Sequence, residues 1–355
     1  MRVCLIASSR YPIREPFAGG LESMTHLLAR GLAERGHQVT LFAGPGSDPG
    51  LPVRLLPLRT VEVSAAALAD QHAPGPEWVA DHHAYLGLML SLAEAGASEH
   101  DVIHNNSLHH LPLAMARTVG VPMVTTLHTP PLPLLESALA LDPDCSEFVA
   151  VSRWTSQAWS HAVRSRVIHN GLDLDAWRAG PGGGAAVWSG RLVREKAPHE
   201  AIHACRAAGV PLVLAGPTPD PAYFREEVAP LLGGGVAHVG HLSQAELSAL
   251  LRQASVAVVT PQWDEPYGLV AAEAMASGTP VAAYARGGLT EVVSPEAGVL
   301  VPGGDVDALA GAVLESQRID RRGVRQHAEQ TCGADVMIDA YERVYAQAVT
   351  PKRAA

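Results

Sequence analysis

Short apolar runs alternate with longer stretches of helical spacing along this chain, and the alternation occurs twice. The run "RVCLIA" at 2–7 predicts a buried strand, and the apolar residues of 21–37 then recur at the spacing of a helix. "QVTLFAG" at 38–44 predicts the next strand. A strand, a helix and a second strand in this order indicate an α/β domain with a parallel sheet.

The segment "RAGPGGGA" at 178–185 interrupts the alternation, because its glycines and proline cannot hold a regular element. The stretch 60–98 is expected to be helical, although its apolar phase is poorly defined, and 334–349 is expected to form a last helix. Further strands are expected before the interruption at 101–107, 121–128 and 147–152, and after it at 185–190, 210–216, 236–241, 255–261, 279–285 and 298–302.

The length of 355 residues is more than one hydrophobic core usually holds, so two domains are expected. We predict an α/β fold with two doubly wound, Rossmann-like domains at 1–170 and 171–333, and a C-terminal segment, 334–355, that crosses back to the first domain. Ligands of such sheets collect at the carboxyl ends of the strands. Two domains that face each other would therefore form a cleft lined by residues from strand ends.

The charge pattern excludes several classes of function. The net charge is −10 and no run of Lys and Arg occurs, which disfavours nucleic-acid binding and a polybasic membrane patch. The N-terminal apolar run is too short for a signal peptide, and no segment is apolar over a length that spans a bilayer. The four cysteines are scattered, as in a reduced protein of the cytoplasm, which is the expected location.

One glutamate lies in a stretch that is otherwise apolar or small. Between Gly268 and Gly278 the exceptions are Glu273 and Ser277, and the alanines favour a buried helix. A buried carboxylate without a partner costs roughly 3–5 kcal/mol. Glu273 is therefore expected either to pair with an arginine of its domain or to face a polar ligand whose hydroxyls accommodate the charge.

A second glutamate, Glu265, precedes the same helix by a few residues. The strand at 255–261, the loop "QWDEPYG" and a helix that begins near Gly268 place free backbone N–H groups beside Glu265. Such a helix end binds an anion such as phosphate. Two carboxylates and an anion site in one loop suit a ligand that has both hydroxyls and a phosphate.

Lysine is rare in this chain. Of 26 basic side chains two are lysines, Lys196 and Lys352, which leaves 24 arginines. Because the chain otherwise uses arginine, Lys196 is a candidate for a functional point charge.

The sequence closely resembles the family 4 retaining glycosyltransferases of GT-B fold, also called glycosyl transferases group 1. The segments that carry the resemblance follow the family's order and cover nearly the whole chain. They are "AGGLE" (18–22), "TLHTPP" (126–131), "VSRWT" (151–155), "VIHNGLD" (167–173), "SGRLVREKAPHEAI" (189–202), "VGHLS" (239–243) and "EPYGLVAAEAMASGTPV" with the following "GGLTEVV".

The resemblance implies transfer of a hexosyl-type sugar, with retention of configuration, from a nucleoside-diphosphate sugar to a hydroxyl acceptor. UDP or GDP is the expected nucleotide, and the acceptor is a small molecule, a glycan or a lipid-linked molecule. The resemblance also implies chemistry without a metal or a cofactor, because cationic side chains and a helix end supply the positive field.

The resemblance assigns roles residue by residue. It places Glu265 by the donor sugar, Glu273 on the ribose, and Arg191 and Lys196 on the diphosphate. His128 would lie beside the transferred sugar, although a histidine at a strand end is usually structural. The remaining residues implied to bind the donor are Gly19, Gly20, His241, Leu242, Tyr267, Gly268 and Leu269.

Several other signals carry less weight. "DPD" at 142–144 lies among prolines in a loop, and the histidine pairs at 82–83 and 109–110 lack the spacing of metal ligands. "GPGGG" precedes a strand, so it is not a dinucleotide fingerprint. Glu291 and His104 are assigned to the scaffold rather than to a ligand.

Related activities remain open. A nucleotide-sugar epimerase would turn over the donor without an acceptor, a phosphorylase would need free phosphate, and a catalytically silent partner would bind the donor only. The nucleotide base, the sugar, the acceptor and the oligomeric state are not predicted from the sequence.

Overall fold

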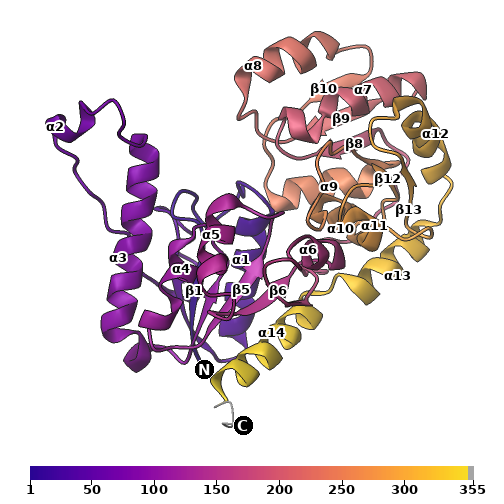
Figure 1. Cartoon of the computed structure of the whole chain (residues 1–355). Coiled ribbons are helices and arrows are strands. Elements are labelled where there is room, and N and C mark those ends of the chain that lie inside the picture. Colours follow the sequence, from indigo (N-terminus) through magenta and orange to yellow (C-terminus); the bar gives the residue numbers. More distant parts are fainter. Residues whose placement is uncertain (351–355) are drawn as a thin grey trace. The chain divides into compact units, whose positions relative to one another are not determined.

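The computed structural model describes residues 1–350, which form two compact α/β units (Figure 1). Unit 1 comprises Met1–Ala150, Ser156–Ile168 and, of the described residues, 338–350. Unit 2 comprises Val151–Thr155 and His169–Met337. Relative to the expected boundaries at 170/171 and 333/334, this division also places the short segment Val151–Thr155 in unit 2.

The described strands of unit 1 form one parallel sheet in the order β3-β2-β1-β4-β5-β6-β7. Its central strands are largely apolar and buried on both faces, which explains why they occur in the sequence as short, mainly apolar runs. The strands are β1 (Arg2–Ile6), β2 (Gln38–Phe42), β3 (Arg54–Leu55), β4 (Val102–Asn105), β5 (Met123–Leu127), β6 (Glu147–Ala150) and β7 (Ser165–Val167).

Helices cover both faces of this sheet. On one face, Cys4 and Ile6 of β1 pack with Tyr85 and Met89 of the long helix α3, and α2 lies beyond the N-terminal end of α3 (Figure 1). On the other face, His104 of β4 contacts α14. The helices are α1 (Gly20–Glu34), α2 (Ala65–Leu68), α3 (Pro76–Glu99), α4 (Leu111–Ala114), α5 (Pro133–Leu141), α6 (Arg153–Ala158) and α14 (Ala334–Val349), of which α6 and α14 begin in unit 2.

The described strands of unit 2 form a second parallel sheet, in the order β10-β9-β8-β11-β12-β13. The strand β11 lies in the middle of this order, so the loop that follows it leaves the centre of the carboxyl edge. The strands are β8 (Ala186–Ser189), β9 (Leu212–Ala215), β10 (Val236–His238), β11 (Ala257–Val259), β12 (Val281–Tyr284) and β13 (Gly298–Val301).

The helices of unit 2 also lie on both faces of their sheet. Helices α7 and α12 pack on the face that presents Trp188 and Val258. Helices α9, α10 and α13 pack on the other face, so α10 is enclosed by protein. The helices are α7 (Pro198–Ala207), α8 (Pro221–Tyr223), α9 (Gln244–Gln253), α10 (Leu269–Ala276), α11 (Leu289–Val292), α12 (Val306–Ser316) and α13 (Arg321–Thr331).

The expected strands are all present, each within its predicted range, and the last helix has the predicted bounds. The interruption at 178–185 carries no helix, and Ala185 directly precedes β8. The expectation of a helix over 60–98 is wrong for 60–64 and 69–75, which are irregular and largely exposed. Exposed residues carry no apolar period, so the pattern could not separate α2 from α3. Within residues 1–350, no helix is both long and apolar enough to cross a bilayer.

Candidate active site

The loop Asp264–Gly268, called the carboxylate loop below, joins β11 to α10 at the carboxyl edge of the unit 2 sheet. Gly268 lies just before α10 with a φ of 101°, a conformation that favours glycine, and a Cβ there would approach Leu289 Cδ2 to 2.4 Å. Gly287 has a φ of 56°, and its Cβ would meet the backbone oxygen of Glu265 at 2.3 Å. Gly288 N–H donates to that oxygen at 2.6 Å. Glycines at these positions therefore let two loops pack backbone to backbone.

Lys196 forms an ion pair with Glu265 of the carboxylate loop. Glu265 is buried, and its Oε1 also accepts a hydrogen bond of 3.0 Å from Trp263 Nε1. Lys196 Nζ lies 4.8 Å from the centre of the Trp263 ring, within the range of a cation–π contact. The charge of Glu265 is thus balanced by a cation that is itself held on an aromatic face.

The backbone of Lys196 is anchored by the strand that carries the loop. Thr260, just after β11, donates its hydroxyl to the carbonyl oxygens of Lys196 at 2.9 Å and Ala197 at 3.0 Å. Thr260 in turn accepts from Trp188 Nε1 at 3.0 Å. Because these partners are buried, the position of Lys196 follows from the packing of the sheet.

Arg191 follows β8, the neighbour of β11, so it lies at the same edge of the sheet. Its Nη2 pairs with Glu195 Oε1 at 3.0 Å, and nearly half of its side chain, 46%, is exposed. The two predicted diphosphate-binding residues are therefore both paired with glutamates, Arg191 at the surface and Lys196 in a partly buried position.

Glu273 lies in the middle of α10, and its side chain forms no ion pair with any described residue. The expected alternative of an internal arginine partner is therefore not found. Burial raises the pKa of Glu273 to about 8, because the charged form loses its water without gaining a cation. In the ligand-free protein at neutral pH, this carboxyl group is mainly protonated.

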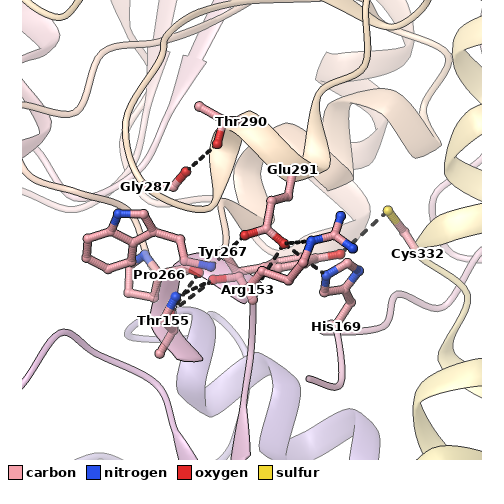
Figure 2. A network of polar contacts seen from close by, with 11 residues as sticks. Arg153, Thr155, His169, Pro266, Tyr267, Gly287, Thr290, Glu291 and Cys332 are labelled. Atoms are coloured by element: carbon pink, nitrogen blue, oxygen red, sulfur yellow. Dashed lines mark hydrogen bonds and ion pairs between the residues drawn. The ribbon is translucent and has the colours of Figure 1, made fainter. Parts of the chain in front are cut away.

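A second polar network holds the carboxylate loop from another direction (Figure 2). Glu291 accepts from the backbone N–H groups of Arg153 at 2.9 Å and Trp154 at 2.6 Å, which begin α6. Thr155 donates its hydroxyl to the carbonyl oxygen of Pro266 at 3.1 Å. The segment Val151–Thr155 is thereby tied to the loop, which explains its place in unit 2.

Tyr267 has a buried side chain in this network. Its hydroxyl donates to Cys332 Sγ at 3.7 Å, and its ring lies 5.6 Å from that of His169 (Figure 2). Burial raises the pKa of Tyr267 well above its usual value. Of the predicted donor contacts, Tyr267 can thus offer its backbone rather than its ring.

His241 and Leu242 lie farther along the same carboxyl edge of the unit 2 sheet. They follow β10, an edge strand that β9 and β8 separate from β11. The His241 side chain is exposed, and Leu242 is partly exposed. Gly240, just before His241, accepts the N–H of Gly216 at 2.7 Å, and Gly216 packs on the backbone of Gly190, so the loops after β10, β9 and β8 lie side by side.

The remaining predicted residues belong to unit 1. Gly19 has an extended backbone and directly precedes α1, whose first residue is Gly20. His128 follows β5, and its Nε2 donates to Asn106 Oδ1 at 2.9 Å. Burial lowers the pKa of His128 to about 3, so the imidazole is uncharged at neutral pH.

Sequence reasoning missed Trp263 and the Arg153–His169 network, and it assigned Glu291 to the scaffold. Tryptophan in "QWDEPYG" directly precedes the acidic pair, which was the available signal for Trp263. Among residues 1–350, no group of three or more His, Cys, Asp or Glu side chains is arranged to hold a metal ion.

The sequence matches two family descriptions. Residues 181–329 match "Glycosyl transferases group 1", and residues 18–176 match "Glycosyltransferase Family 4". A glycogen synthase of Mycobacterium tuberculosis is 30% identical, over 88% of this chain and 85% of the relative. A D-inositol 3-phosphate glycosyltransferase of Mycolicibacterium paratuberculosis is 28% identical, over 99% of this chain and 92% of the relative.

Solved structures share the fold at lower identity. Anabaena HepE, in complex with UDP and glucose, superimposes with a TM-score of 0.74 at 21% identity and covers 98% of this chain and 99% of its own. Sucrose-phosphate synthase from Thermosynechococcus elongatus has a TM-score of 0.78 at 22% identity, over 98% of this chain and 99% of its own. The predicted GT-B fold is confirmed by these matches.

Proposed function

Since the chain belongs to the group 1, family 4 glycosyltransferases, we propose that it transfers a hexosyl-type sugar from a nucleoside-diphosphate sugar to a hydroxyl acceptor, with retained configuration. One observation carries the proposal. Lys196 pairs with Glu265 and lies against the Trp263 ring, and the helix that follows Glu265, α10, buries Glu273 without an ion-pair partner. UDP is the first nucleotide to test, because HepE is described in complex with UDP and with UDP-glucose.

Lys196 and Arg191 would bind the diphosphate by exchanging their glutamate partners for phosphate oxygens. The backbone N–H groups at Gly268 and Leu269, where α10 begins, would add the positive end of the helix dipole. As the bond to the sugar breaks, negative charge grows on the leaving oxygen, and these groups stabilise it. We propose that no metal ion takes part.

Glu273 would accept hydrogen bonds from the two ribose hydroxyls. A group that is protonated when alone can ionise when two donors approach, so nucleotide binding would release a proton near neutral pH. Glu265, freed from Lys196 by the diphosphate, would contact hydroxyls of the donor sugar.

The remaining assignments follow the family resemblance. His128 would contact the transferred sugar as a neutral imidazole, and Gly19 and Gly20 would approach the phosphates closely. His241 and Leu242 are proposed to meet the base. The acceptor hydroxyl would attack from the face that the diphosphate leaves, with a departing phosphate oxygen taking its proton, so Glu265 is not assigned as a nucleophile.

The test begins with nucleotide binding. UDP, GDP, ADP and TDP are compared by thermal shift, because a ligand of the native state raises the melting temperature. The sugar nucleotide of the best base is then incubated with acceptors in the presence and absence of EDTA, and the anomeric configuration of the product is read by NMR.

Three results would contradict the proposal: no shift with any nucleotide, an inverted product, or activity abolished by EDTA. Donor turnover without an acceptor but with a changed sugar would indicate an epimerase. A requirement for free phosphate would indicate a phosphorylase.

A further inference from the structure

The indole of Trp263 lies against both charged side chains of the candidate active site in unit 2. Its Nε1–H donates to Glu265 Oε1 at 3.0 Å, and the centre of its ring lies 4.8 Å from Lys196 Nζ. Lys196 and Glu265 also pair with each other. The indole thus contacts the carboxylate with its edge and the ammonium group with its face.

The backbone just before Trp263 is bonded to the turn that carries Lys196. Gln262 N–H donates to the carbonyl oxygen of Glu195 at 2.8 Å, and Thr260 donates its hydroxyl to the carbonyl oxygen of Lys196 at 2.9 Å. These bonds do not involve the charged groups. The ring of Trp263 therefore stays beside Lys196 even when the ion pair between Lys196 and Glu265 opens.

The turn that carries Lys196 has an uncommon backbone conformation. Ala197, which follows Lys196, has a φ of 45° and a ψ of 52°, and among the described residues it is the one residue other than glycine with a positive φ. Its N–H donates to the carbonyl oxygen of Val193 at 3.2 Å, and its own carbonyl oxygen accepts from Thr260 at 3.0 Å. Such a conformation persists where surrounding contacts fix it, and it occurs often at functional sites.

The side chain of Glu265 uses one of its two oxygens for the protein. Both of its side-chain partners among the described residues, Lys196 and Trp263, contact Oε1, which leaves Oε2 to a ligand. Glu265 is buried, so a loss of all partners would be costly. When a diphosphate draws Lys196 away, the bond from Trp263 Nε1 is the contact that keeps this carboxylate in place.

We propose that Trp263 is a positioning residue for the donor. Its N–H keeps Glu265 turned toward the donor sugar after Lys196 has bound the diphosphate, and its ring face keeps Lys196 within reach of the phosphates. This inference rests on the proposed function. An indole N–H is an uncharged donor, so it orients the carboxylate without neutralising it, and the negative charge remains available to the sugar hydroxyls. A cation–π contact is weaker than a bond to phosphate, so the ring does not prevent Lys196 from binding the diphosphate.

Two substitutions separate the edge of the indole from its face. Trp263→Phe retains a ring for Lys196 and removes the N–H, whereas Trp263→Gln retains an N–H donor and removes the ring. The full chain is used, with the nucleoside diphosphate that the thermal-shift screen selects and the corresponding sugar nucleotide.

The two variants should differ in what they lose. We expect Trp263→Phe to lower kcat/KM for transfer at least roughly tenfold, as for a lost hydrogen bond to a charged acceptor, while the Kd of the free diphosphate changes less than about twofold. Trp263→Gln should raise the Kd of the free diphosphate roughly 2- to 5-fold, as for a lost cation–π contact at a partly exposed site. Gln262→Ala is the control, because this exposed neighbour donates its side chain to Glu200 instead.

A double-mutant cycle shows whether Trp263 acts through Glu265. In a Glu265→Ala background the indole N–H has no carboxylate to orient, so Trp263→Phe should then change the rate by less than about twofold. A residue that only supports the packing of the loop would lower the rate equally in both backgrounds. Because binding of the free diphosphate is measured on the same proteins, a lost rate is distinguished from unfolding.

Three results overturn this inference alone: wild-type kcat/KM in Trp263→Phe, an equal cost of Trp263→Phe with and without Glu265, or a loss of free diphosphate affinity in Trp263→Phe as large as the loss of kcat/KM. Failure of the wild type to bind any nucleoside diphosphate overturns the proposed function as well.

Discussion

The carboxylate loop of unit 2 and the ring cluster of unit 1 (Trp78, His82, Tyr85, His109 and His110) both lie at the carboxyl edge of a parallel sheet, but their polar groups are compensated to different degrees. Around the carboxylate loop the charged side chains are paired, Lys196 with Glu265 and Arg191 with Glu195. Around the ring cluster the imidazoles His82 and His110, and at the end of β4 the amides of Asn105 and Asn106, are uncompensated.

The difference teaches what each edge can bind. A paired cation can exchange its carboxylate for a phosphate oxygen when the freed carboxylate gains new hydrogen-bond donors, as proposed for Glu265 and the sugar hydroxyls, so the first edge suits a sugar diphosphate. At the second edge the charged pair is Arg10 with Asp81, and the groups without partners are uncharged amides and imidazoles. Each prediction below tests one side of this contrast.

The largest effect is expected when Arg191 and Lys196 are both replaced by alanine. We expect kcat/KM for transfer to fall about 1,000-fold, because one group that stabilises a developing negative charge is commonly worth about 10²–10³. Initial rates of nucleoside-diphosphate release provide the measurement. Arg194→Ala is the control, since Arg194 lies in the same turn but pairs with Glu227. Near-normal rates in the double variant would remove the diphosphate role.

The same double variant leaves Glu265 buried without its cation, which could lower stability as well as activity. A triple variant that adds Glu265→Gln removes this charge. If the melting temperature recovers while the rate stays low, the loss of activity belongs to the missing cations and not to unfolding.

His128→Ala tests an uncharged polar group of unit 1. We expect kcat to fall about 100-fold, the lower range for one positioned polar group at a reacting centre. Because burial holds the pKa of His128 at about 3, this imidazole should produce no inflection in the rate between pH 5 and 8. His161→Ala, an exposed histidine of unit 1, serves as the control. An inflection near pH 6.5 that disappears in His128→Ala would show a charged imidazole instead.

Glu273→Gln should weaken nucleotide binding about tenfold, the value of a hydrogen bond to a charged acceptor. Its stability effect has a definite sign. The folded pKa of about 8 exceeds the ordinary value of 4.5, so the stability due to the protonated form is fully present below pH 4.5 and is lost as pH rises through 8. Relative to wild type, Glu273→Gln should gain on the order of 3–5 kcal/mol between these limits.

Denaturant unfolding at a series of pH values, with and without nucleotide, measures this gain. Calorimetry in buffers of different ionisation enthalpy should detect a proton released when the wild type binds nucleotide and none for Glu273→Gln. Equal affinity of the two proteins for the free nucleotide would contradict the ribose assignment.

The central strands could be predicted well from the sequence, because strands that are buried on both faces consist mainly of consecutive apolar residues. β3 and β7 were missed because they are short, and the exposed Arg54–Leu55 has no such run. The glutamate pair and Lys196 could be predicted from local pattern and residue scarcity. The ring cluster could not, because α3 and the segment after β4 bring His82 and His109 together only in the folded sheet. Likewise, nothing local in "VSRWT" indicates that its backbone is held by Glu291.

Glu291→Ala should give the smallest effect, and it tests whether the carboxylate loop needs its second support. Without this carboxylate, the first N–H groups of α6 lose their acceptor, which should cost about 1 kcal/mol, as for a lost helix cap. We expect kcat/KM to fall a few-fold, since Glu265 is still held by Lys196 and Trp263 from the other direction. Glu291→Gln retains an oxygen acceptor and should restore most of the rate, whereas Glu296→Ala, at an exposed position, should change nothing. A loss as large as that of the Arg191 and Lys196 double variant would mean that Glu291 contacts the substrate itself. The distinction between charged groups that bind the donor and residues that only support them would then be wrong.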